Sequence, residues 1–144
     1  MKQEILHLKV AEKDDIPVII PLLEELYNAS IYKELASFNK QDIEKALIHT
    51  TTQHIGQGCS ILLYKDLQPV GVLICSYMTH FFNSEHKTAV ELAYWIKPEA
   101  KDYKTSRLLL KAYKEWAKRI GCKSYLLGKL QPDAPEKTIL RKLS

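Results

Sequence analysis

The sequence predicts a mixed α/β domain whose sheet is antiparallel at its centre. Three observations favour this fold class: short runs of alternating or β-branched residues, segments with the apolar period of a helix, and a hairpin pattern in mid-chain. Of the 144 residues, 46% are hydrophobic and 26% are charged. This is the size of one domain and the composition of a globular protein, so we expect a single domain over residues 1–144.

One strand and two helices are predicted in the first third of the chain. Residues 4–11 alternate between apolar and polar side chains, as in a half-buried strand. Apolar residues then recur with helical spacing over residues 16–27, where Pro17 suits a first helical turn. Pro21 lies inside this pattern and is predicted to kink the helix or delay its start. A second helix is predicted to begin at Asn39.

The centre of the chain predicts three consecutive strands. They cover about residues 60–64, 70–77 and 88–96. The first two are separated by a short polar turn, which predicts a hairpin.

A long amphipathic helix is predicted over residues 105–120. Gly121 follows it, and glycine is a common residue just past a helix end. A short strand over residues 123–127 and a final helical segment over residues 135–143 complete the chain. The predicted order is therefore β-α-α-β-β-β-α-β-α.

Composition argues against several classes of protein. Cys59, Cys75 and Cys122 are far apart in apolar surroundings, which predicts buried reduced thiols rather than disulfides or a metal site. No apolar run reaches the roughly 18 residues that span a bilayer, and the N-terminus is too polar for a signal peptide, so we expect a soluble cytoplasmic protein. The net charge of +4 suits an anionic ligand and is weak support for nucleic-acid binding.

The segment from Val90 to Gly121 carries the strongest functional signal. It leads from a strand through a polar turn to a helix N-terminus, where free backbone N–H groups and the helix dipole favour an anion. Lys101, Lys104 and Arg107 add positive charge to the same turn. This arrangement predicts a pyrophosphate group as the ligand.

The sequence resembles the GNAT superfamily of N-acetyltransferases, especially its small phage-type members. The resemblance rests on Gln68-Pro69-Val70-Gly71, Glu91-Leu92, Trp95-Ile96-Lys97-Pro98-Glu99, Leu108-Leu109-Leu110 and Glu115-Trp116-Ala117-Lys118-Arg119-Ile120-Gly121. It implies a mixed, mostly antiparallel twisted sheet flanked by helices. It also implies an enzyme that moves an acetyl group from acetyl-CoA to an amine, without indicating which amine.

In this family the turn before the long helix carries an Arg/Gln-x-x-Gly-x-Gly/Ala signature, whose backbone amides hold the pyrophosphate of CoA. Lys101, Lys104 and Ser106 occupy the matching positions, so a lysine stands in place of the first glycine. The resemblance implies cofactor-binding residues at the strand end, in the turn and in the first helical turn. They are Trp95, Ile96, Lys101, Asp102, Tyr103, Lys104, Thr105, Ser106 and Arg107.

Two residues are candidates for proton transfer. The resemblance implies Glu91 as the general base for the amine; the alternative is an outward-facing strand glutamate in a cross-strand charge pair. Regular alternation would place Glu91, Ala93 and Trp95 on one face of the sheet. Family members supply a tyrosine acid from a helix after the fifth strand. That segment has no tyrosine here, so Tyr125 is the nearest substitute.

Further possibilities stay open. Lys104 and the apparent lack of the family's last two strands also suit a degenerate GNAT fold that binds CoA or a partner without turnover, and a homodimer could complete the sheet edge. A basic nucleic-acid-binding module using Lys101, Lys104, Arg107 and the surface tyrosines is another hypothesis, although no known nucleic-acid motif is present. By family analogy, His80 and His86 could line the acceptor site; solvated loop histidines are the alternative.

Overall fold

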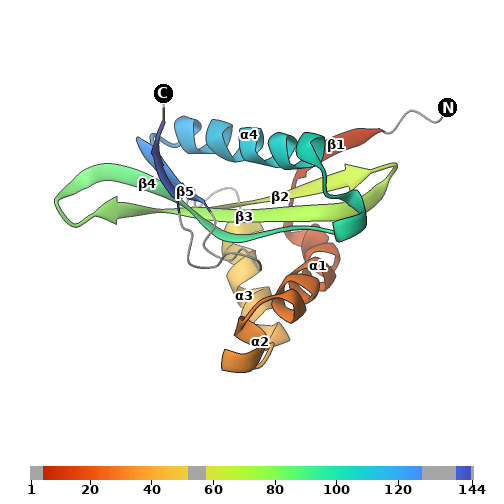
Figure 1. Ribbon diagram of the computed structural model, residues 1–144. Helices are drawn as coiled ribbons and strands as arrows, with labels where there is room; N and C mark the ends of the chain where they lie inside the picture. Colours follow the sequence, from red (N-terminus) through yellow and green to blue (C-terminus); the bar gives the residue numbers. More distant parts are fainter. Residues whose placement is uncertain (1–4, 52–57, 128–138, 144) are drawn as a thin grey trace.

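The computed structural model describes residues 5–51, 58–127 and 139–143. A six-stranded sheet forms the middle layer, with strands in the order β1-β2-β3-β4-β5-β6. One long helix, α4, covers one face, and α1, α2 and α3 lie on the other face (Figure 1). The predicted mixed α/β class is therefore confirmed. No helix in the described ranges is long and apolar enough to cross a membrane.

The strands pair antiparallel except at one point. Their bounds are β1 (Leu6–Val10), β2 (Gly58–Lys65), β3 (Gln68–His80), β4 (Asn83–Ile96), β5 (Ser124–Leu127) and β6 (Ile139–Lys142). Only β4 and β5 run parallel. The central hairpin is confirmed, and β3 and β4 form a second, longer hairpin that extends beyond the helices (Figure 1).

Helices α1, α3 and α4 lie where the sequence predicts helices, whereas the short helix α2 was not predicted. Their bounds are α1 (Ile16–Ala29), α2 (Tyr32–Leu35), α3 (Lys40–Thr51) and α4 (Tyr103–Arg119), with short 3-10 turns η1 (Lys13–Asp15) and η2 (Pro98–Ala100). The side chain of Asn39 caps α3 by accepting a hydrogen bond from the backbone N–H of Asp42 at 3.0 Å. Pro21 lies inside α1 and does not delay its start. Gly121, with φ of 89°, follows the end of α4 as expected.

The predicted last helix is wrong. Residues 139–142 form strand β6, which pairs antiparallel with β5 through Leu126–Leu140 and its neighbours. The edge of β5 offers unpaired backbone groups, and a short apolar segment satisfies them by pairing as a strand. Residues 135–138 of the predicted helix lie outside the described residues.

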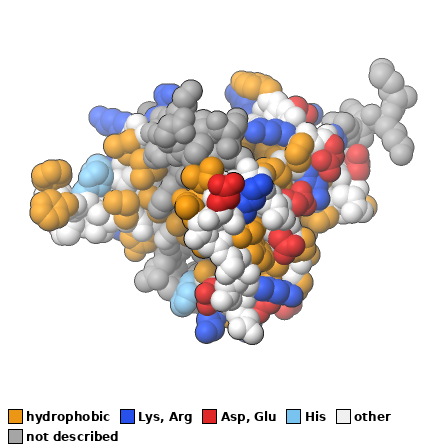
Figure 2. Space-filling model, turned by 60° about the horizontal axis from the view of Figure 1, so that its bottom comes forward, with side chains coloured by type: hydrophobic (Ala, Val, Ile, Leu, Met, Phe, Trp, Pro, Cys, Tyr) orange, Lys and Arg blue, Asp and Glu red, His pale blue; other side chains and the backbone are white. Residues whose placement is uncertain are grey.

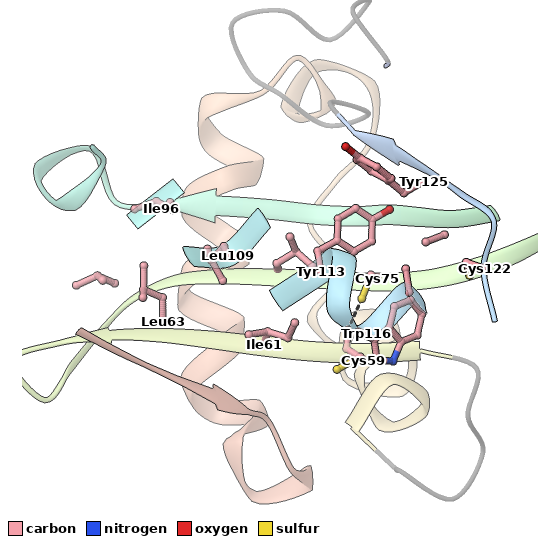
Figure 3. Close-up of a cluster of buried hydrophobic side chains, with 14 of the residues drawn as sticks. Cys59, Ile61, Leu63, Cys75, Ile96, Leu109, Tyr113, Trp116, Cys122 and Tyr125 are labelled. Carbon is pink, nitrogen blue, oxygen red and sulfur yellow. Dashed lines mark hydrogen bonds between the residues drawn. The ribbon is translucent and has the colours of Figure 1, made fainter. Parts of the chain in front are cut away.

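Two hydrophobic cores lie on opposite faces of the sheet. Between α4 and the sheet, Leu109, Tyr113 and Trp116 pack against strand residues such as Leu63 and Ile96 (Figure 3). The other core joins α1 and α3 to the opposite face of the same strands. A strand residue in the first core therefore points toward α4, and one in the second core points toward α1 and α3.

All three cysteines are free and buried in the core beneath α4, as predicted. Cys59 and Cys75 lie directly opposite each other on β2 and β3. The thiol of Cys75 donates a hydrogen bond to the carbonyl oxygen of Cys59 at 3.5 Å.

Candidate functional site

Strands β4 and β5 run side by side only briefly. They pair at Thr88–Ser124 and Ala89–Tyr125, and no further pair joins them. Strand β4 then continues to Ile96, while β5 continues beside β6. On the β5 side, the edge of β4 from Val90 onward has no strand partner among the described residues. The backbone groups on this side are therefore available to an extended ligand.

A bulge in β4 lies next to this opening. Cys75 of β3 pairs with Glu91, but the preceding residue, Ile74, pairs with Ala93, so Leu92 is the extra residue. Directly opposed residues share a face, and Cys75 belongs to the core beneath α4, whereas Ile74 belongs to the core beside α1 and α3. Glu91 thus points toward α4 and Ala93 points away from it.

The predicted face for Glu91 is therefore wrong. Strict alternation would place Glu91 with Ala93 and Trp95, but the extra residue Leu92 reverses the direction of everything before it. Ala93 and Trp95 do lie together, facing α1 and α3.

Glu91 is fully buried beneath α4, so the alternative of an outward-facing glutamate is also wrong. Its charge acts on two tyrosines on the same side. Burial is the main cause that raises the pKa of Tyr94, and the Glu91 carboxylate raises it further against a hydrogen bond with Ser106. Burial likewise raises the pKa of Tyr113, with contributions from Cys75 and Glu91. Glu91 thus lies on the α4 side of the sheet, within electrostatic reach of the Tyr94 and Tyr113 hydroxyl groups.

The turn after β4 is held by its own carboxylate. Asp102 caps α4 by accepting a hydrogen bond from the backbone N–H of Thr105 at 2.9 Å, and the Thr105 hydroxyl accepts one from the N–H of Asp102 at 3.0 Å. The bond from the Thr105 amide is the main reason that the pKa of Asp102 is lowered. One of the helix N–H groups expected to be free is therefore occupied.

The predicted cofactor residues of this turn divide into two groups. Lys101, Tyr103, Lys104 and Arg107 are exposed, and Arg107 donates a hydrogen bond to the Tyr103 hydroxyl at 3.4 Å. Thr105 is 1% exposed and donates to the carbonyl of Ala100, while Ser106 bonds Tyr94. The exposed side chains can meet a ligand, whereas the buried ones hold the turn against β4.

The side chains at and just after the end of β4 pack into the two cores or bond to Glu25 of α1. Trp95 Nε1 donates a hydrogen bond to Glu25 at 3.3 Å, and Lys97 forms an ion pair with the same carboxylate at 2.6 Å. Ile96 is buried beneath α4. The backbone of Trp95 and Ile96, as the sequence predicts, is the part that can contact a cofactor.

Tyr125 lies at the last residue pair between β5 and β4. Its side chain is 4% exposed, and its ring meets that of Tyr113 edge-on, with centroids 5.9 Å apart. Lys114 of α4 lies over the same ring at 5.3 Å. Figure 3 shows the Tyr125 hydroxyl directed away from Trp116 and Cys122. Tyr125 and Glu91 are thus both placed where the two strands part.

His80 and His86 lie near the turn of the β3–β4 hairpin and contact hydroxyl groups of the sheet. His80 Nε2 lies 2.6 Å from the Thr88 hydroxyl, which lies 2.7 Å from that of Ser124. His86 Nε2 lies 3.4 Å from Ser124. Both imidazoles are half-buried and packed edge-on, so they are not simply solvated loop side chains.

A cavity of about 340 Å³ lies on the face opposite Glu91. Leu92 and Ala93 form part of its wall, and residues from α1, α2, α3 and the segments between these helices form the rest. Figure 2 views the molecule from this side and shows hydrophobic side chains among the charged ones. The sequence did not reveal this cavity, because its apolar residues have the same spacing as ordinary core positions.

Comparison with known proteins gives a consistent result. Residues 23–135 match the family model described as the acetyltransferase (GNAT) family. No curated protein sequence matches the chain.

Several solved structures share the fold. The aminoglycoside N-acetyltransferase AAC(6')-Iy in complex with CoA is 11% identical, with a TM-score of 0.70 over 86% of this chain and 76% of its own. A predicted acetyltransferase from Clostridium acetobutylicum with acetyl-CoA is 9% identical, with a TM-score of 0.67 over 84% and 79%. A ribosomal-protein-alanine N-acetyltransferase from Brucella melitensis is 12% identical, with a TM-score of 0.62 over 84% and 77%.

Proposed function

The chain belongs to the acetyltransferase (GNAT) family, and from this membership we propose that it transfers the acetyl group of acetyl-CoA to an amine nitrogen. The observation that carries the proposal is the parting of β4 from β5 directly after Ala89–Tyr125, beside the bulge at Leu92. A thioester lying along the open edge of β4 would meet backbone groups there and could be approached from both faces of the sheet.

The cofactor would lie along the edge of β4 and end at the turn before α4. The backbone of Trp95 and Ile96 would contact the pantetheine arm. Lys101, Lys104 and Arg107 are exposed around the turn and would attract the pyrophosphate. Because the cap occupies the Thr105 amide, these cations would carry more of the attraction than in a glycine-rich turn.

Tyr103 lies in the same exposed turn and would contact the adenine nucleotide. Asp102, Thr105 and Ser106 would act by shaping the turn, because their side chains bond the backbone of the turn or Tyr94. The proposed phosphate site thus consists of three exposed cationic side chains around the capped N-terminus of α4.

The reaction is a direct acyl transfer. The lone pair of the neutral amine attacks the thioester carbonyl carbon, and the carbonyl oxygen takes up negative charge that backbone N–H groups would stabilise. Collapse of this intermediate breaks the C–S bond, and CoA leaves as the thiolate. The nitrogen loses one proton, and the thiolate gains one.

Glu91 is the proposed base and Tyr125 the proposed acid. Tyr125 forms part of the last β4–β5 pair, and Glu91 is two residues past it. Since Glu91 points toward α4, the proton would reach it through the opening between the strands.

Ligand-induced stabilisation tests the proposal. Acetyl-CoA and CoA should raise the melting temperature, because both are expected to bind the folded chain and not the unfolded one. ADP controls for binding of any nucleotide. If CoA binds, release of free thiol with a panel of amines measures transfer. The absence of any shift at millimolar CoA would overturn the proposal.

A second candidate is a GNAT fold that binds CoA or a partner without turnover. The observation in its favour is Asp102, whose carboxylate lies at the helix N-terminus where phosphate oxygens would otherwise accept hydrogen bonds. CoA binding without thiol release from any amine would favour this candidate.

Three finer expectations remain proposals. They are the likeness to small phage-type members, the cytoplasmic location, and a homodimer that completes the sheet edge. Gel filtration with light scattering tests the homodimer.

A further inference from the structure

We propose that the acceptor is a small primary amine on an aryl or arylalkyl body, held by the cavity beside the β4 bulge. The reaction in this inference rests on the proposed acetyl transfer. The class of ligand rests separately on the cavity, which can be tested without the cofactor.

The cavity wall is built mainly from apolar and aromatic side chains of β4, the helices α1, α2 and α3, and the segments that connect these helices. Leu92 and Ala93 come from β4, Leu26 and Tyr27 from α1, and Phe38 from the segment before α3. The rings of Tyr27 and Phe38 are tilted at 52° with centroids 5.3 Å apart, so they form one aromatic wall.

Two polar side chains of the wall, Tyr27 and Ser30, are bonded to the chain itself. The Tyr27 hydroxyl donates to the carbonyl of Ala36 at 2.6 Å. Ser30 Oγ donates to the carbonyl of Tyr27 at 3.0 Å and accepts from the N–H of Tyr32 at 3.3 Å. They present little unused hydrogen-bonding capacity to a ligand, so the surface offered is mainly hydrophobic.

None of the described residues that line the cavity is charged. A polycationic acceptor would lose hydration at several ammonium groups there and gain no carboxylate in return, which is costly. A ligand with one amine and a hydrophobic body would bury its body and leave the amine at the mouth. The cavity therefore discriminates against polyamines and aminoglycosides.

The volume sets the size of this body. An apolar cavity of about 150 Å³ holds a benzene molecule. The 340 Å³ present here thus accommodates a bicyclic aromatic group or one ring with a short alkyl chain.

The position of the cavity connects it with the reaction. Leu92 and Ala93 are the bulge residues, and they lie on the stretch of β4 that no other described strand covers on the β5 side. An amine on a short chain, with its ring beside Tyr27 and Phe38, would reach the edge where the thioester is proposed to lie.

Binding by ligand-observed NMR, without cofactor, tests the inference. The probes are 2-phenylethylamine, tryptamine, the uncharged analogue 2-phenylethanol, and kanamycin as a polycation. We expect the three aromatic probes to bind and kanamycin to bind at least tenfold more weakly. Leu92→Gln and, from the opposite wall, Phe38→Ala should each weaken aromatic binding about fivefold or more. Leu67→Gln, at an exposed turn residue, is the matched control and should leave it unchanged.

The outcomes separate the two proposals. Aromatic probes that bind, while no amine of the panel is acetylated, would contradict the acetyl transfer and leave the ligand class standing. Tighter binding or faster acetylation of kanamycin, or of a peptide N-terminus, than of the aromatic amines would overturn the ligand class alone. The ligand class would also be overturned if Leu92→Gln and Phe38→Ala both fold and both bind the aromatic probes as tightly as the wild type.

Discussion

Glu91 and Ala93, two residues apart on β4, lie on opposite faces of the sheet. In a regular strand they would share a face. The extra residue at Leu92 therefore divides the proposed site into two sides: a buried carboxylate beneath α4, and an apolar cavity beside α1 and α3. The opening between β4 and β5 lies between the carboxylate and the cavity, so a group that passes through this opening would face both of them.

Replacing Glu91 by glutamine should slow acetyl transfer without loss of CoA binding. Glutamine has nearly the same shape but cannot take a proton, and a positioned base contributes typically about 10²- to 10⁴-fold to a rate. We expect kcat/KM to fall by roughly 10²-fold and the acidic limb of its pH profile to disappear. The CoA-induced rise in melting temperature should be unchanged. A variant with the full rate and the same pH profile would remove Glu91 from the mechanism.

Reversing the charge of Lys104 should weaken CoA binding. Lys104 is exposed in the first turn of α4, where the proposed pyrophosphate would lie. We expect Lys104→Glu to raise the Kd of CoA by roughly three- to tenfold at low salt, and by less at high salt because of screening. Calorimetric titration at two salt concentrations measures both effects.

Lys111→Glu is the matched control. Lys111 is exposed on the same helix two turns further on, about 10 Å away along the axis and near one screening length. An equal loss of affinity in both variants would indicate attraction by overall charge and would contradict a phosphate site at the turn.

Removing the charge of Asp102 should strengthen CoA binding. Asparagine caps a helix about as well as aspartate, so Asp102→Asn should keep the melting temperature while removing an anion from the proposed phosphate position. We expect a several-fold lower Kd for CoA by calorimetry. Asp102→Ala serves as the control for the cap and should lower the melting temperature. Weaker CoA binding by the well-folded Asn variant would place the phosphates elsewhere.

The sequence was sufficient to predict the elements that depend on periodicity. The helices now described as α1 and α4 and the central hairpin have clear apolar patterns and sharp ends, as at Gly121. The turn between β4 and α4 could likewise be located, since a strand, a polar turn and a helix lie in immediate succession. These features depend on neighbouring residues in the chain, so the pattern of the sequence is enough to predict them.

The features that were missed depend on pairing between distant segments. The bulge at Leu92 arises from the register of β4 against β3, and nothing in Val90–Ala93 distinguishes it from regular alternation. The last strand, β6, forms because β5 has a free edge, whereas the sequence pattern of 135–143 fits a helix equally well. The role of Asp102 as a cap was missed because the helix was predicted to start two residues too late.

Tyr113 should make stability fall with rising pH in the alkaline range. Burial raises its pKa in the folded chain above the value of about 10 of an unfolded tyrosine, and its hydroxyl donates a hydrogen bond to the carbonyl of Leu126 at 2.8 Å. The stability it contributes is therefore complete below pH about 10 and is lost as the unfolded chain ionises above that pH.

Urea denaturation at pH 8, 9.5 and 11 compares the wild type with Tyr113→Phe. At pH 8 the variant should be less stable by about 0.5–1.5 kcal/mol, the usual net loss for one hydrogen bond. Above pH 10 this difference should shrink by about 1.4 kcal/mol per pH unit, because phenylalanine cannot ionise in the unfolded state. Tyr103→Phe, at an exposed position, should show no such pH-dependent change. A difference that stays constant from pH 8 to 11 would mean that Tyr113 ionises as readily in the folded chain as in the unfolded one.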